Sequence, residues 1–280
     1  MRWRTRILLG AVGLVAVAVG GVFGASEWTI RRRHAVAPEP LAADRSEAGV
    51  KEGARLVRVL GCLDCHGAAA QGQILADQPL MGRLRAPALA PIVQRESDMV
   101  LARTFRHGVD RNGVTLWAMP TRPTLADDDA ARVVGYLRTL RPSARDVSGL
   151  AWFGPLGRVQ ILKGGLEPSV HPEIAAPRRR PADTGAYFVR VVCEACHDLY
   201  QPRAIGPVAV APPLAYMAAA YDDDAFRRLL RTGRGMGPRD LGEMRRAAET
   251  GLAWLNDDEI TAIKAYLTRM AALPPPPAKP

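Results

Sequence analysis

All four cysteines of this chain belong to two copies of one short pattern, Cys-x-x-Cys-His. The pattern occupies Cys62, Cys65 and His66 in the first half of the chain and Cys193, Cys196 and His197 in the second. Two thiols at this spacing can each add to a vinyl group of one porphyrin, and the histidine that follows can bind the iron. The pattern therefore predicts two covalently bound c-type haems, with the cysteines as attachment points and the histidines as proximal ligands.

Two other kinds of site use paired cysteines. A zinc site would require the two pairs to converge, and it would not require a histidine after each pair. A thioredoxin-like redox pair is expected beside a βαβ pattern, which this sequence lacks. Covalent haem attachment explains all six residues of the two patterns and is the favoured interpretation.

Each copy of the pattern opens a repeat of predicted helices. Segments 53–61 and 185–192 predict helices that lead into the cysteines. Segments 97–108 and 222–233 predict a later helix, which a glycine ends in each half. Because the pattern and the helices recur in the same order, we expect two small domains, each organised around one haem.

The repeat continues to a methionine and a last helix. From the helix-ending glycine onward the halves align without a gap, which places Met119 and Met244 at the same offset. The last helix of each half has apolar residues at helical spacing. It begins in an acidic turn, at 127–129 and 257–259, that suits the positive end of a helix dipole.

This order of elements resembles the class I cytochromes c. These are small all-helical domains in which an N-terminal helix bearing the cysteines crosses a C-terminal helix, and a loop methionine completes the iron. The resemblance covers most of residues 44–141 and 182–270. It implies an all-α fold with two tandem class I cytochrome c-like domains.

The resemblance also implies the iron ligands, which are one histidine and one methionine for each haem. His66 would pair with Met119, and His197 with Met244. Met119 is followed by a proline, as is common in the family, whereas Met244 is not. Met236, in a glycine-rich stretch, is the competing ligand for the second haem. His107, which is outside the patterns, is expected at the surface or at a haem edge.

The N-terminus predicts a membrane anchor over residues 1–30. Residues 7–25 carry no charge, three arginines lie on each side, and Trp3 and Trp28 stand at the two ends, as interfacial tryptophans do. A cleaved signal peptide, with a small-residue site near Gly24, is the alternative. The arginines do not decide the orientation. Because haem is attached after export in the family, the resemblance implies a single-pass protein of the bacterial inner membrane with its haem domains in the periplasm.

The remaining segments connect or end the domains. Residues 142–181 are rich in Gly and Pro and are expected to form an inter-domain linker or a strap over the first haem domain. Residues 271–280 are expected to form a Pro-rich tail. The formal charge is +10, with 15 basic against 11 acidic residues in 44–145. This excess could steer an acidic redox partner, and no basic-aromatic stripe indicates nucleic-acid binding.

A haem iron with both axial positions filled by His and Met has no open position for a substrate, and it passes single electrons. We therefore expect a membrane-tethered dihaem electron carrier rather than an enzyme. Residues 106–140 resemble the cytochrome subunits of membrane-bound alcohol and gluconate dehydrogenases, which implies a periplasmic or membrane-bound dehydrogenase or other oxidoreductase as donor and a downstream acceptor. The alternative is a dihaem enzyme, of the peroxidase or thiosulfate dehydrogenase type, with its reaction at the second haem.

Overall fold

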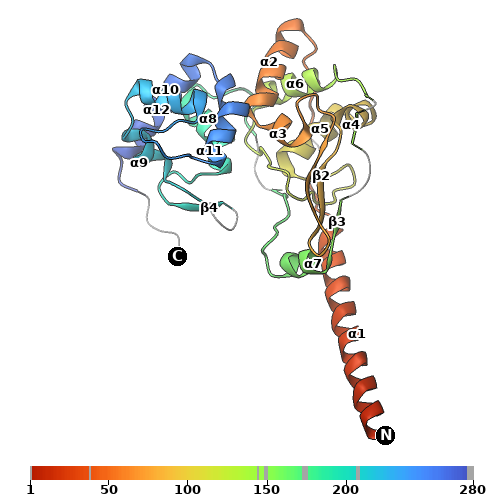
Figure 1. Cartoon of the computed structure of the whole chain (residues 1–280). Coiled ribbons are helices and arrows are strands. Elements are labelled where there is room, and N and C mark those ends of the chain that lie inside the picture. The colour runs from red at the N-terminus through yellow and green to blue at the C-terminus, as the bar shows by residue number, and fades with distance from the viewer. Residues whose placement is uncertain are drawn as a thin grey trace.

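The computed structural model of the chain describes residues 2–37, 39–143, 145–147, 151–171, 176–205 and 209–275. Figure 1 shows two groups of helices side by side, above one long helix, α1 (Arg2–Ile30). We call residues 44–141 the first half and residues 182–270 the second half. The predicted Pro-rich tail lies outside the described residues from Pro276 onward.

The first half contains five helices and a hairpin. In chain order these are α2 (Glu47–Val59), α3 (Cys62–His66), β1 (Gln73–Gln78), β2 (Gly82–Ala86), α4 (Leu89–Arg95), α5 (Asp98–His107) and α6 (Asp127–Leu137). The hydroxyls of Ser46 and Ser97 cap α2 and α5 by accepting from backbone N–H groups. Gly108, with a φ of 68°, ends α5 in the left-handed conformation that glycine tolerates best.

The second half repeats this order and adds α11 and η2 before its last helix. It consists of α8 (Thr184–Val191), η1 (Cys193–Ala195), β4 (Arg203–Ile205), β5 (Ala209–Ala211), α9 (Leu214–Ala219), α10 (Asp223–Thr232), α11 (Glu243–Thr250), η2 (Leu252–Trp254) and α12 (Asp257–Ala271). The prediction of a mostly helical chain with an apolar N-terminal helix is confirmed. The expectation of an all-α fold overlooked two short antiparallel hairpins, β1–β2 and β4–β5, which pair the backbone of the loop after each cysteine pattern.

A glycine sets the helix crossing in each half. Helix α2 packs on α6, and a Cβ built at Gly53 would come 1.9 Å from the carbonyl oxygen of Arg132. Helix α8 packs on α12, and a Cβ at Gly185 would come 2.1 Å from that of Ala262. The backbones therefore approach closely at equivalent points. Around them the buried side chains of both halves form one apolar cluster, which includes Leu56, Val133, Phe188 and Ile263.

The segment between the halves packs on the first half and on α1. Strand β3 (Trp152–Phe153) pairs with β2, and α7 (Pro155–Leu162) packs against α1. Further along, Pro168 forms a bridge with Trp117. Among the described residues, α1 is the one helix that is long and apolar enough to cross a membrane.

Candidate functional site

The first cysteine pattern forms the short helix α3 between two glycines. Gly61 (φ 73°) and Gly67 (φ 81°) both have positive φ, which lets the chain turn sharply into and out of the pattern. The Nδ1 atom of His66 lies 2.7 Å from the carbonyl oxygen of Pro87. Because a carbonyl only accepts hydrogen bonds, Nδ1 is the donor, and the lone pair of Nε2 is free to bind a metal.

The histidine of the second pattern has the same arrangement, although no glycines flank this pattern. The pattern occupies η1 and the residues that follow, and Nδ1 of His197 donates to the carbonyl oxygen of Pro212 over 2.9 Å. Burial lowers the pKa of both His66 and His197, against the opposing effect of these hydrogen bonds. Both imidazoles are thereby favoured in the neutral form, which is the form that can ligate iron.

The cysteine thiols do not resemble those of a redox pair. Burial raises the pKa of Cys62 to about 11 and that of Cys193 to about 12, whereas reactive redox cysteines have lowered values. None of the four cysteines forms a disulfide. Among the residues that the structure describes, no group of three His, Cys, Asp or Glu side chains could hold a metal ion, so the two cysteine pairs do not converge as a zinc site requires.

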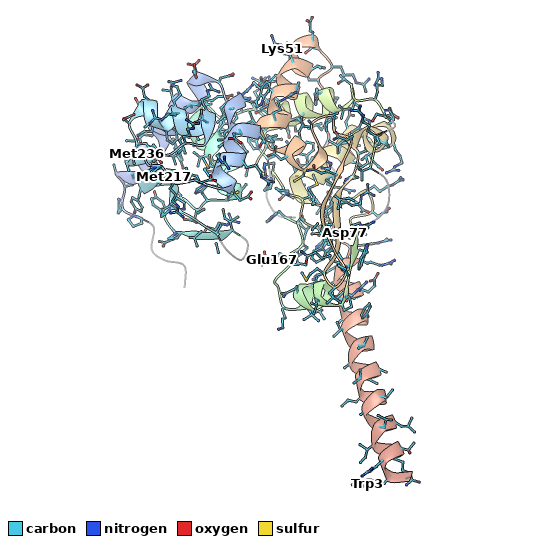
Figure 2. The ribbon with its side chains drawn as sticks, viewed as in Figure 1. Trp3, Lys51, Asp77, Glu167, Met217 and Met236 are labelled. Carbon is cyan, nitrogen blue, oxygen red and sulfur yellow. The ribbon has the colours of Figure 1, made fainter. Side chains whose placement is uncertain are left out.

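The two candidate methionines lie in different surroundings. Met119 is half-buried in a non-helical loop, where its backbone N–H donates to Ser169 Oγ over 3.1 Å. Met244 is half-buried at the second position of α11 and packs against the apolar cluster. Met236 is 61% exposed, and in the view of Figure 2 it lies toward the side of the second half that faces away from the first. Met119 and Met244 remain the predicted ligands.

Two of the buried donors that have no hydrogen-bond partner among the described residues flank Met119 in the chain. They are Nε1 of Trp117, two residues before Met119, and Nε of Arg122, three residues after it. Arg122 also donates from Nη2 to the carbonyl oxygen of Leu60 over 2.8 Å, which ties the methionine loop to the end of α2 beside Cys62. Orphaned buried donors call for an acceptor. The carboxylates of a haem would supply one, so these residues fit that group.

The two cysteine patterns lie near the junction of the halves. Burial lowers the pKa of Arg122, against the opposing effect of Cys62 and Cys65 of the first pattern and of Cys196 of the second. Burial raises the pKa of Asp64, inside the first pattern, against the opposing effect of the side chain of Thr250 at the end of α11. Helix α11 therefore begins at the candidate ligand of the second half and ends beside the pattern of the first.

A buried cluster of charges, which sequence reasoning missed, joins the halves. Arg180, from the segment between them, donates to Asp129 Oδ1 over 2.9 Å and to Glu52 Oε1 over 3.2 Å. Its guanidinium also lies 5.1 Å from the ring centre of Phe188. No local pattern in the sequence marks these residues as neighbours.

Other site residues could have been found from the sequence. Ala-Pro-x-Leu recurs at 86–89 and 211–214, and its prolines are the two that accept from the histidines. The expectation that His107 lies at the surface or at a haem edge is wrong as regards the surface. His107 is 3% exposed, and its Nδ1 lies 2.7 Å from the carbonyl oxygen of His171, because the segment between the halves covers it.

Comparisons with known proteins agree with this geometry. Residues 50–141 match the family model of cytochrome c. The chain is 28% identical over 283 residues to the gluconate 2-dehydrogenase cytochrome c subunit of Pantoea cypripedii. That alignment covers 83% of this chain and 62% of the relative, so the chain spans less than two thirds of the relative's length.

Proposed function

Because residues 50–141 form a domain of the cytochrome c family, we propose that the whole chain is a dihaem cytochrome c that passes single electrons between redox partners. The observation that carries this proposal is the pair of equivalent histidines, His66 and His197. Each follows a Cys-x-x-Cys pattern, and each donates from Nδ1 to a proline carbonyl. This matched pair supports a second haem domain over residues 182–270.

The residues of the chain would hold each haem in the same way. The cysteines would form thioethers, the histidine would bind iron through Nε2, and Met119 or Met244 would supply the second protein ligand. When bound in this way, a haem supplies one-electron oxidation and reduction without an open coordination position. The proline carbonyls keep the Nδ1 proton in place and orient the imidazole rings, and Trp117 and Arg122 would be the donors available to the carboxylates of the first haem.

We place the haem domains in the periplasm, tethered to the inner membrane by α1. The length and apolar character of α1 support an anchor, although the same features fit a signal sequence. The relative named above is the cytochrome c subunit of a dehydrogenase. By analogy, the electron donor of this chain would be a periplasmic or membrane-bound dehydrogenase, and a downstream acceptor would take the electrons.

One observation keeps a catalytic second haem as the alternative. Met244 lies on a helix, whereas Met119 lies in a loop that the segment between the halves covers. A weakly held methionine at the second haem would leave an iron position for a substrate, as a dihaem peroxidase or thiosulfate dehydrogenase requires.

Low-temperature electron paramagnetic resonance of the oxidised, haem-loaded full chain in detergent distinguishes these functions. We expect two low-spin signals of the His/Met type and two haems per chain by pyridine haemochrome assay. A high-spin second haem would contradict the electron-carrier proposal and favour the enzyme. A single haem per chain would contradict the dihaem proposal itself.

A further inference from the structure

An apolar surface lies at the base of the first half, where it adjoins α1. It consists of Leu80, Trp152, Leu156 and Leu162, which are 59%, 43%, 50% and 43% exposed, and we call it the base surface. The backbone N–H of Leu156 donates to the carbonyl oxygen of Leu80 over 2.9 Å, Trp152 lies in β3, which pairs with β2, and Leu162 ends α7. Clustered exposed apolar side chains of this kind indicate an interaction site.

The position of the base surface along α1 is set by one arginine of α7. Arg158 lies 2.8 Å from a carboxylate oxygen of Glu27 and donates to Ser26 Oγ over 3.0 Å. Its guanidinium also lies 4.7 Å from the ring centre of Phe23. Ser26 is fully buried under these contacts, whereas residues 3–21 of α1 are exposed. Helix α7 is therefore held at the level of residues 23–27.

That level coincides with the end of the apolar run of α1. At the rise of an α-helix, residues 7–25 span about 28 Å. The hydrocarbon core of a bilayer is about 30 Å thick, so a span over these residues puts Phe23 to Glu27 at its outer boundary. Trp3, at the far end of α1 in Figure 2, would then mark the inner boundary.

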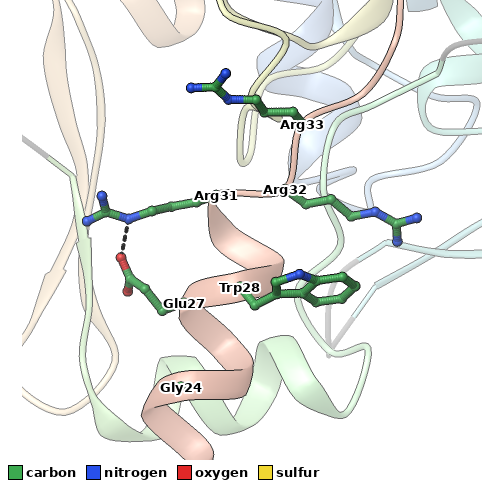
Figure 3. A pocket seen from close by; sticks show the side chains of 6 residues that line it. All are labelled: Gly24, Glu27, Trp28, Arg31, Arg32 and Arg33. Carbon is green, nitrogen blue, oxygen red and sulfur yellow. Dashed lines mark hydrogen bonds and ion pairs between the residues drawn. The ribbon is translucent and has the colours of Figure 1, made fainter.

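The residues that follow Glu27 are those that suit a lipid headgroup region. Trp28 is 68% exposed, and the guanidinium of Arg32 lies 5.5 Å from its ring centre. Figure 3 shows Arg31 paired with Glu27 on one side of the helix, and Trp28 with Arg32 on the other. Interfacial tryptophans and cations near anionic lipids are typical of this depth.

We propose that the base surface is a second membrane contact, which lies in the interfacial layer of the bilayer that α1 crosses. The proposal rests on the proposed anchoring by α1. Figure 1 shows α7 lying across the outer end of α1. A second contact there would hold the first half against the membrane and restrict its movement about α1. The segment that carries α7 continues to Ser169, which binds the Met119 loop. Docking would therefore hold the first haem site at a constant height above the membrane.

Photo-crosslinking with lipid tests this contact. The haem-loaded full chain is reconstituted in nanodiscs of phosphatidylcholine and phosphatidylglycerol that contain a phosphatidylcholine with a diazirine near its headgroup, and cross-linked peptides are identified by mass spectrometry. We expect labelling of α1, of α7 and of the peptide that contains Leu80. The matched control is the second-half hairpin β4–β5, whose Val210 is 68% exposed and which should stay unlabelled. The double variant L156E/L162E should lose most labelling of α7 and keep that of α1, whereas V210E should change neither.

Each other outcome overturns the proposal in a distinguishable way. Labelling of α1 without labelling of α7 and Leu80 would overturn the second contact and leave the anchor intact. A mature chain that lacks α1, shown by N-terminal sequencing, would overturn both. If α7 were unlabelled by lipid at one copy per disc, but cross-linked to another copy when several share a disc, the occupant would be a second chain and not the membrane.

Discussion

Arg55 of α2 and Glu259 of α12 form a two-pronged ion pair across the junction of the halves, with both N–O distances at 2.8 Å. The side chains are 14% and 5% exposed. Glu259 also accepts from the backbone N–H of Asn256, which caps α12, and Arg180 joins the same cluster. The relative placement of the two cysteine patterns therefore depends on buried charges as well as on apolar packing.

Replacement of Arg55 by Met should destabilise the holoprotein by about 3 kcal/mol, because it leaves Glu259 buried without its main partner. The free energy of unfolding is measured by denaturant titration and circular dichroism. The control is R83M, which removes the more exposed pair of Arg83 with Asp77 and should cost about 1 kcal/mol or less. Equal losses of unfolding free energy in the two variants would show that the buried pair at the junction contributes no more than an exposed pair.

Acid should weaken the junction through Glu52. Partial burial raises the pKa of Glu52, but hydrogen bonds from Arg55 and Arg180 outweigh this effect and bring the pKa below 4.5. A carboxylate with a lowered folded-state pKa contributes stability that is present above its unfolded pKa and is lost as the pH falls through the folded value. E52Q should therefore lose less stability than the parent chain as the pH falls below about 5, where the Glu52 carboxylate of the parent chain begins to protonate. The same pH dependence in both proteins would contradict this role of Glu52.

Alanine at either crossing glycine should separate a pair of helices. An added Cβ would meet backbone oxygen at 1.9 Å at Gly53 and at 2.1 Å at Gly185, and backbone cannot move aside as a flexible side chain can. We expect G53A and G185A each to destabilise the protein by about 1–3 kcal/mol, as overpacking does. G237A, where nothing lies within 4 Å, is the control, with an expected change near zero. Thermal unfolding of the three variants makes the comparison, and wild-type melting of G53A would refute the close approach at that site.

Histidine in place of a ligand methionine should lower the reduction potential of the haem it binds, because methionine ligation raises the potential relative to two nitrogens. We expect M119H and M244H each to shift one of the two potentials in a spectroelectrochemical titration. The control is M236H, at an exposed position, which should shift neither. A lowered potential in M236H with none in M244H would identify Met236 as the ligand.

The segment between the halves should steady the Met119 loop. Ser169 Oγ accepts from the backbone N–H of Met119, and the backbone N–H of Ser169 donates to the carbonyl oxygen of Leu116 over 2.9 Å. S169A should cost about 1 kcal/mol and should increase the fraction of reduced haem that binds carbon monoxide, because the methionine is displaced more easily. S143A, near the start of the segment, should not. Unchanged carbon monoxide binding in S169A would argue against a positioning role.

The sequence predicts a site best where its chemistry requires residues that are close together along the chain. Covalent attachment and proximal ligation require cysteines and histidine within one turn, so the two patterns can be identified without a structure. Helices α5 and α10 follow from apolar periodicity and from capped ends such as Ser97 and Gly108. The short hairpins were not predicted. Their strands pair the backbone N–H and C=O groups of a loop, and they do not bury one face of alternating apolar side chains.

The amino-acid sequence by itself determined two Cys-x-x-Cys-His patterns, the repeat of helices that surrounds them and one apolar N-terminal helix. Only the tertiary structure decided which distant residues meet: Arg55 with Glu259, 204 positions away, Ser169 with Met119, and α7 with the outer end of α1. The reason is physical. Periodicity, capping and motif spacing are properties of neighbouring residues, whereas these contacts form only once apolar burial has brought separate elements together, and no local spacing encodes them.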